Sequence, residues 1–167
     1  NYGQYEQGVT EILANVKANG DQALFEYTKK FDQADLNAGN IKVTDAEIEE
    51  LIREMEKMFS QEGYEKTYQW AVNTINEYPN CNLLIWQIAV MLDSRRILGE
   101  CENPDRYDDQ INSWYELALN DENESIQHHA ADSLFGFYLR KQNYEMAEKY
   151  LNYFSDYDPM KKVIWGR

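Results

Sequence analysis

The chain has 167 residues, long enough for one domain with a core or for an extended helical array, and its formal net charge is −14. Residues 1–50 hold 10 acidic and 4 basic side chains, and residues 51–167 hold 20 and 12. Both parts would repel a phosphate backbone, so no direct contact with nucleic acid is expected. No apolar run approaches the roughly 20 residues of a membrane-spanning helix, and no signal-peptide pattern opens the chain, which predicts a cytoplasmic protein without membrane contact.

The first part of the chain has the pattern of two short helices. Apolar residues recur at helical spacing from Val9 to Val16, and Asn19-Gly20 supplies a left-handed stop. A second apolar stripe runs from Leu24 to Phe31, followed by a loop and a short candidate strand at Ile41–Val43. Together they predict an N-terminal helical extension over residues 1–43.

The residues in this extension resemble the N-terminal segment of histidinol dehydrogenase. The resemblance rests on residues 9–13, on the GDxAL pattern at 20–24, on the YTxxFD pattern at 27–32 and on residues 43–48, and it is expected to end near Glu50. It implies a structural segment, because the zinc ligands and acid–base residues of that family lie much further along its chain. One reading is therefore a rearranged or fused fragment of this NAD-dependent oxidoreductase of histidine biosynthesis, without its catalytic residues.

Residues 44–167 contain an internal repeat at a separation of 80 residues. Tyr64 and Pro79 recur as Tyr144 and Pro159, with small or apolar residues in register between them. Five helical stripes lie within about 64–78, 83–92, 111–119, 125–139 and 144–158, after a first helix that begins at Thr44, and residues 93–107 interrupt them as an insertion. This pattern predicts an all-α fold, a tetratricopeptide-like array of antiparallel helical hairpins, an alpha-alpha superhelix. A further helix is expected to open at Val163–Trp165.

Residues 51–167 also resemble the C-terminal repeat region of XRE-type helix-turn-helix transcriptional regulators. The resemblance rests on the EYPN motif at 77–80, LIWQ at 84–87, SWY at 113–115 and HHAAD at 128–132. It implies a region that receives a partner or small signal and forms a homodimer, while a separate domain reads DNA. The main prediction is thus a non-enzymatic interaction or sensing module of a transcriptional regulator, lacking its DNA-binding domain.

The sequence offers no catalytic constellation, and we predict no cofactor, no metal and no enzymatic activity. The two histidines, His128 and His129, are neighbours that point about 100 degrees apart on a helix. Glu124, His128 and Asp132 share one face, which could hold a weak divalent ion but is better explained as a solvated polar face. Cys81 and Cys101 lack metal spacing and are expected to be free thiols.

Binding is predicted in a groove formed by the first helices of the hairpins. In a tetratricopeptide-like register these helices turn one face to the concave side, and Trp86 is the most informative residue on it. The candidates are Glu49, Ile52, Glu56, Trp86, Val90, Asp93, His129, Asp132 and Arg140. Four carboxylates and one arginine favour a basic or amphipathic peptide as the protein partner, while the alternative is that the acidity only maintains solubility. Trp70, Trp114 and Tyr144 are instead assigned to the core.

Overall fold

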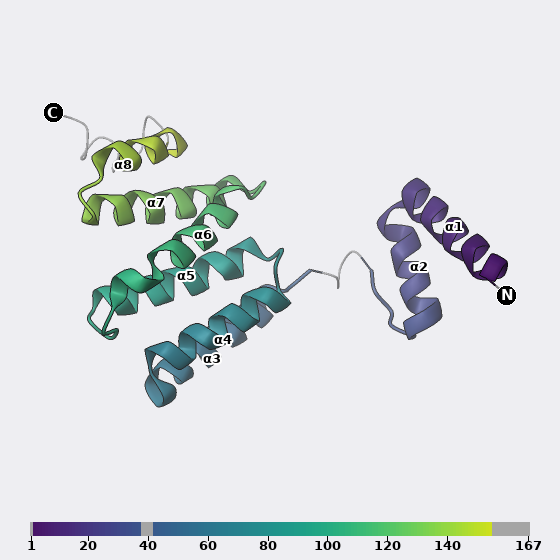
Figure 1. Cartoon of the computed structure of the whole chain (residues 1–167), viewed down its shortest axis with the longest axis horizontal. Helices are drawn as coiled ribbons and strands as arrows, with labels where there is room; N and C mark the ends of the chain where they lie inside the picture. Colours follow the sequence, from purple (N-terminus) through teal and green to yellow (C-terminus); the bar gives the residue numbers. More distant parts are fainter. Residues whose placement is uncertain (1, 38–41, 155–167) are drawn as a thin grey trace. The chain divides into compact units, whose positions relative to one another are not determined.

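A computed structural model describes residues 2–37 and 42–154, and every secondary-structure element in these ranges is a helix (Figure 1). The all-α prediction is therefore confirmed. The short strand predicted at Ile41–Val43 is absent at Lys42 and Val43, and Ile41 lies outside the described residues. The chain divides into two compact units, Asn1–Thr44 and Asp45–Arg167, which are considered separately below.

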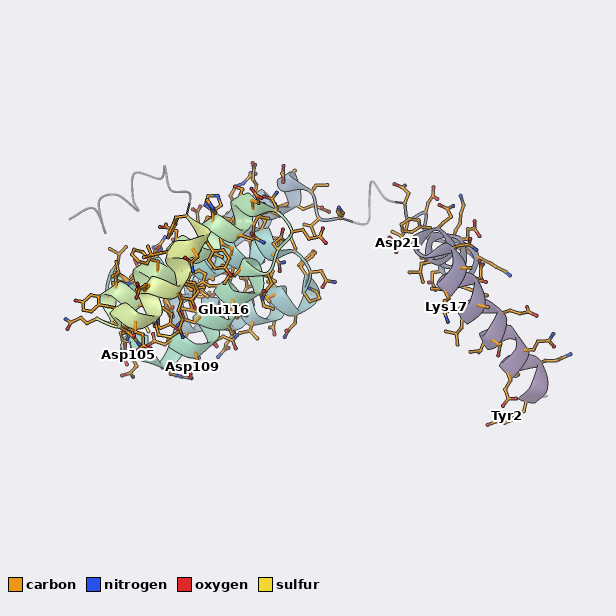
Figure 2. The ribbon with its side chains drawn as sticks, turned by 90° about the horizontal axis from the view of Figure 1, so that it is seen from above. Tyr2, Lys17, Asp21, Asp105, Asp109 and Glu116 are labelled. Carbon is orange, nitrogen blue, oxygen red and sulfur yellow. The ribbon has the colours of Figure 1, made fainter. Side chains whose placement is uncertain are left out.

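The first unit is a hairpin of α1 (Tyr2–Asn19) and α2 (Asp21–Asp32). Gly20 joins the two helices with a φ of 55°, a left-handed conformation that glycine adopts without a steric penalty, as the sequence predicts. Asn15 Nδ2 donates a hydrogen bond to the Tyr27 hydroxyl at 3.0 Å across the hairpin. Among the described residues of this unit only Ala23 is buried, so most side chains stand free along both helices (Figure 2).

The second unit is a succession of three hairpins. The first pairs α3 (Asp45–Glu62) with α4 (Tyr64–Glu77), and the second pairs α5 (Asn82–Ile97) with α6 (Asp108–Leu119). The third pairs α7 (Glu124–Arg140) with α8 (Tyr144–Tyr150), and two short 3-10 helices, η1 (Pro104–Tyr107) and η2 (Leu151–Tyr153), precede α6 and follow α8. Figure 1 shows the hairpins stacked in chain order, with α5 packed against both α6 and α7.

Apolar stripes explain why these helices stack. Helix α5 is apolar on almost every side, and its central residues Leu84, Ile85, Ile88, Ala89 and Leu92 are fully buried because neighbouring helices cover it on several sides. Gly63 separates α3 from α4 with a φ of 80°, which lets the chain reverse within one residue. The core of this unit thus lies between successive hairpins, as expected where no hairpin can bury its own apolar face.

The 80-residue repeat is matched in burial at two positions but not at all of them. The tyrosine that opens it differs between the copies, and Thr74 is buried whereas its counterpart Phe154 is half-buried. Thr67 and Ala147 are both fully buried, and so, nearly, are Ala71 and Leu151. Tyr64 is buried and donates a hydrogen bond to the Leu92 carbonyl at 2.9 Å, whereas its counterpart Tyr144 is 62% exposed. Helix α5 and η1, which follow Tyr64, cover it. Pro159 and the helix predicted at Val163–Trp165 lie outside the described residues.

Two details of the predicted core and insertion require correction. Trp114 is buried as predicted, but the prediction for Tyr144 is wrong, and Trp70 is only half-buried because its indole N–H donates to Glu54 at 3.2 Å at the surface. The predicted insertion begins too early, since α5 continues through Asp93 to Ile97. Asp93 and Arg96, charged residues that look like part of a loop, lie inside the helix and form an ion pair one turn apart.

Candidate functional site

Six of the nine predicted groove residues lie on α5 and α7, and the structure brings them together. Trp86 and His129 stack with ring centroids 4.6 Å apart and planes 18° apart. The Trp86 indole N–H donates to the Ser133 hydroxyl at 3.1 Å. Val90, Asp93, Asp132 and Arg140 line a pocket of about 350 Å³, and Ser133 lines it too. The aromatic stack and the pocket are therefore adjacent parts of one surface, which we call the α5–α7 groove.

The three candidates on α3 are placed differently. Ile52 is half-buried, while Glu49 and Glu56 are exposed, and Glu49 pairs with Arg53 on its own helix at 3.5 Å. These residues line neither the pocket beside Asp132 nor the neighbouring pocket around Arg96. The structure thus gathers the candidates of α5 and α7 into one site and leaves those of α3 apart.

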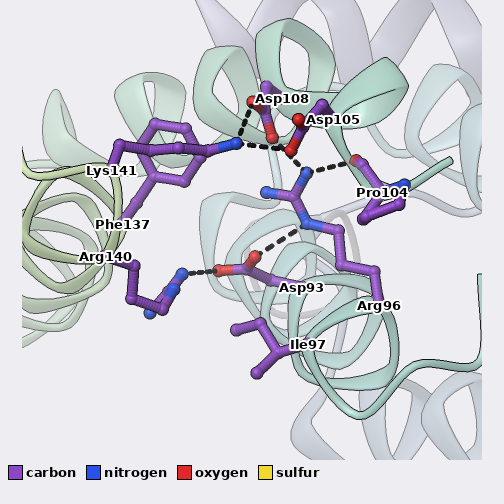
Figure 3. Close-up of a pocket in the computed structure, with 9 residues that line it drawn as sticks. All are labelled: Asp93, Arg96, Ile97, Pro104, Asp105, Asp108, Phe137, Arg140 and Lys141. Carbon is purple, nitrogen blue, oxygen red and sulfur yellow. Dashed lines mark hydrogen bonds and ion pairs between the residues drawn. The ribbon is translucent and has the colours of Figure 1, made fainter.

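Asp93 is the most enclosed charged residue of the groove, and it is fully partnered (Figure 3). Its carboxylate accepts hydrogen bonds from Arg96 Nε at 2.9 Å and from Arg140 at 3.0 Å. The buried hydroxyl of Tyr115 donates to the same carboxylate at 3.0 Å. Only 5% of Asp93 is exposed, so these three donors replace the water that it loses on folding.

Arg96 extends this arrangement to the segment between α5 and α6. One guanidinium nitrogen donates to the Pro104 carbonyl at 2.8 Å and to the Asp108 carboxylate. Lys141, at the end of α7, lies 2.9 Å from Asp108 and also pairs with Asp105. Pro104 and Asp105 belong to η1, so the pairs connect α5, η1, α6 and the end of α7 (Figure 3).

The charges in this cluster balance. Three carboxylates, Asp93, Asp105 and Asp108, meet three cations, Arg96, Arg140 and Lys141. The predicted groove counted Asp93 as a free acidic group, but Arg96 and Arg140 neutralise it. The negative charge of Asp93 is therefore compensated within the cluster, and Asp132 is a second carboxylate that lines the pocket.

The protonation states follow from burial and from these partners. Burial raises the pKa of Tyr115, and the neighbouring Asp93 raises it further, so the hydroxyl stays protonated and donates. Burial of Arg96 works against its charged form, but Asp93 and Asp108 outweigh it and raise the pKa of Arg96. The hydrogen bond from Lys141 lowers the pKa of Asp105. Asp105 is therefore ionised near neutral pH, and Arg96 and Lys141 keep their positive charges there.

A second cluster, of aromatic rings, joins the α3–α4 hairpin to the following helices. Tyr107 of η1 lies edge-on to Tyr64 at 5.1 Å and to Tyr68 at 4.7 Å between ring centroids. Tyr68 also meets Trp114 of α6 at 6.0 Å. The Tyr107 hydroxyl donates to Glu65, which lowers the pKa of that carboxyl. We call Tyr64, Tyr68, Tyr107 and Trp114 the aromatic clasp.

The sequence did not reveal either cluster as a whole. Asp93 and Arg96 are one turn apart, so their ion pair could have been predicted from their spacing. Arg140 and Lys141 are visible in the sequence as two adjacent cations, but their partners are not. The contacts of Arg96 with Asp108 and of Arg140 with Asp93 span 12 and 47 residues, respectively, and no local pattern announces them. Such pairings emerge only when the hairpins stack.

The described residues contain no group of three or more histidine, cysteine, aspartate or glutamate side chains positioned to hold a metal ion. Both cysteines are free thiols, as predicted. Among the same residues, no helix has the length and apolar character needed to cross a bilayer.

Comparisons with known proteins point to histidinol dehydrogenase. The family model of histidinol dehydrogenase matches residues 1–82. The histidinol dehydrogenase of Methanococcus maripaludis is 41% identical over 80 residues, which are 48% of this chain and 18% of the relative. That of Halalkalibacterium halodurans is 50% identical over 52 residues, 31% of this chain and 12% of the relative. A histidinol dehydrogenase homolog of Colwellia psychrerythraea is 55% identical over 42 residues, which are 25% of this chain and 9% of the relative. No solved structure matches significantly.

These matches correct two predictions. The prediction of a transcriptional regulator module is wrong, because the matching family model and these relatives are histidinol dehydrogenases. The family resemblance also does not end at Glu50 but continues to Asn82, the first residue of α5. It therefore covers α1 to α4, and the aromatic clasp joins two tyrosines inside the match, Tyr64 and Tyr68, to two aromatic residues beyond it.

The similarity covers only a small part of each relative. The matched residues span less than a fifth of the length of each of these relatives. The N-terminal part of this chain, over residues 1–82, is similar to the N-terminal segment of histidinol dehydrogenase.

Proposed function

We propose that this chain is a rearranged, non-catalytic fragment of histidinol dehydrogenase, in which helices α1 to α4 of that family are joined to a tetratricopeptide-like array. The observation that carries the proposal is the family match over residues 1–82, which ends where α5 begins. A match that stops at a helix boundary supports the joining of whole helices. Because the resemblance implies that zinc ligands and acid–base residues lie beyond this segment, the matched helices contribute scaffold and no catalytic group.

A dehydrogenase assay tests this proposal directly. The purified chain is mixed with histidinol, NAD and zinc, and the formation of reduced nicotinamide is followed by absorbance. We expect no formation above that of a sample without protein, because the chain has no group assigned to hydride or proton transfer. The histidinol dehydrogenase of Methanococcus maripaludis serves as the positive control. A steady rate that scales with the concentration of this chain, and that is removed when the chain is depleted, would overturn the proposal.

For the α5–α7 groove we propose a basic or amphipathic peptide as the protein partner. The stacked rings of Trp86 and His129 offer a flat aromatic surface, and the carboxylates Asp93 and Asp132 line the pocket that Ser133 connects to that surface. A lysine or arginine side chain on the indole face would gain a cation–π contact, and aliphatic side chains of the peptide could enter the pocket beside Val90.

Calorimetry with a short peptide of alternating lysine and leucine residues tests the groove. We expect Trp86→Ala to weaken binding by about tenfold or more, since it removes the aromatic surface. Trp70→Ala is the matched control, because Trp70 is half-buried on α4 and lies outside the groove. A peptide in which glutamate replaces lysine should not bind. Equal binding by the two tryptophan variants would exclude the groove as the site.

A further inference from the structure

One face of α1, next to the side that packs against α2, is apolar and exposed. Tyr2 is 89% exposed, Tyr5 78%, Val9 55% and Leu13 63%. Their spacing of three, four and four residues places them on one side of the helix along its whole length, from the end marked by Tyr2 toward that marked by Lys17 (Figure 2). An amphipathic helix with such a stripe is normally packed against another element.

Helix α2 does not cover this stripe. The residues of α1 that are half-buried form a neighbouring stripe of Gly8, Ile12, Asn15 and Val16, and Asn15 bonds to Tyr27 of α2. Helix α2 adds two more uncovered apolar side chains, Leu24 at 47% and Phe31 at 61% exposed. With Ala23 as the one buried residue in its described part, the hairpin has no core of its own and presents an unpartnered apolar surface.

We propose that this surface pairs with the same surface of a second copy of the chain, with the two α1 helices antiparallel and crossing at Val9. The apolar positions are symmetric about Val9, because Tyr5 and Leu13 lie four residues to either side and Tyr2 and Val16 lie seven. In an antiparallel pair Val9 meets Val9 and Tyr5 meets Leu13, while Tyr2 lies opposite Val16, which is half-buried at the edge of the stripe. Each apolar side chain thus finds an apolar partner, as a two-fold interface requires.

The charges favour this partner and this direction. Residues 1–44 hold 6 acidic and 4 basic side chains, a net charge of −2 out of −14, which leaves −12 for the rest of the chain. The hairpins of two copies therefore repel each other only weakly. The antiparallel pair places Glu11 opposite Gln7 and Glu6 opposite Ile12. A parallel pair would place each glutamate beside the same glutamate of the other copy.

The area is sufficient for a specific contact. The four exposed apolar side chains of α1 offer on the order of 600 Å² per copy, at the lower end of the roughly 600 to 1,000 Å² per partner of specific interfaces. The interface does not depend on the proposed enzyme ancestry, so it can be tested and can fail independently of the proposed function.

Sedimentation of the full-length chain over a range of concentrations provides the first test. We expect a concentration-dependent dimer, and we expect Tyr5→Lys or Leu13→Glu alone to raise its dissociation constant by at least about 100-fold, because each sets a charge in the apolar contact twice. The double variant Tyr5→Lys/Leu13→Glu should recover most of the affinity, since position 5 faces position 13 of the other copy. A strictly monomeric chain, or a dimer that both single variants leave unchanged, would overturn the proposal. A double variant no tighter than the single ones would exclude the antiparallel register.

Cross-linking provides the second test. In a Cys81→Ser/Cys101→Ser background, Val9→Cys should form a disulfide-linked dimer under mild oxidation. Gln7→Cys is the matched control, because it is exposed at the same level of α1 but points about 155 degrees from the centre of the apolar stripe. Circular dichroism confirms that the variants stay helical. Equal cross-linking of both variants, or binding of the hairpin to a histidinol dehydrogenase that lacks its matched N-terminal segment in place of self-association, would contradict pairing between copies.

Discussion

We expect Asp93→Ala to lower the free energy of unfolding of the second unit by about 3 to 5 kcal/mol, because it removes the shared partner of three donors in a buried site. The side chains of Asp93 and Arg96 are 8% and 4% exposed. Without the carboxylate, the Arg96 guanidinium keeps Asp108 but loses half of its charge compensation, and the Tyr115 hydroxyl loses Asp93 as its acceptor. Urea unfolding followed by circular dichroism measures the change.

A matched control and a double-variant cycle make this prediction specific. Asp105→Asn also removes a carboxylate from the cluster, but the Asp105 side chain is 81% exposed, so we expect a change of less than about 1 kcal/mol. Arg140→Gln should cost less in the Asp93→Ala background than in the original chain, because its partner is already gone. Strict additivity of the two changes, or equal effects of Asp93→Ala and Asp105→Asn, would show that the cluster does not act as a unit.

The second large effect is expected at the aromatic clasp. Tyr107→Ala should cost about 3 to 5 kcal/mol, because Tyr107 is 4% exposed and contacts both Tyr64 and Tyr68. Tyr107→Phe keeps the ring and loses only the hydrogen bond to Glu65, so about 1 kcal/mol is expected. Since the clasp packs α4 against η1 and α6, the alanine variant should loosen the first hairpin.

Native-state hydrogen exchange distinguishes this outcome from general destabilisation. In the Tyr107→Ala variant we expect amides of α3 and α4 to lose protection well before those of α5 and α7. Tyr144→Ala is the control, because Tyr144 is 62% exposed and its loss should change stability by less than about 0.5 kcal/mol. A uniform loss of protection across α3 to α7 would mean that the first hairpin is not a separate cooperative element.

The helices could be predicted from the sequence because their apolar stripes are long and regular. The chain reversals at Gly20 and Gly63 could be predicted for a different reason, because glycine readily adopts the left-handed backbone that both positions have. The end of α5 was predicted too early because Asp93 and Arg96 look like loop residues in isolation. Only their burial beside Arg140 and Asp108 explains why charged residues continue an apolar helix.

The site was less predictable than the fold. Trp86 and His129 lie on one surface, as the helical register of α5 and α7 predicts. The same register also predicted Glu49 and Glu56 at this surface, but these residues do not line its pocket. The family resemblance also reached further than the residues suggested. The stripe from Tyr64 to Ile75 fits a hairpin in any helical protein, so periodicity could not assign it to one family or another.

The turn between α4 and α5 has a practical consequence for dividing the protein. Sequence similarity ends at Asn82, whereas the compact units separate between Thr44 and Asp45, so the α3–α4 hairpin belongs to one part by ancestry and to the other by packing. A truncation at Asn82 would remove Tyr64 from the Leu92 carbonyl and Tyr68 from Trp114, and would uncover one side of α5. Expression of the second unit should therefore begin at Asp45, inside the region of similarity.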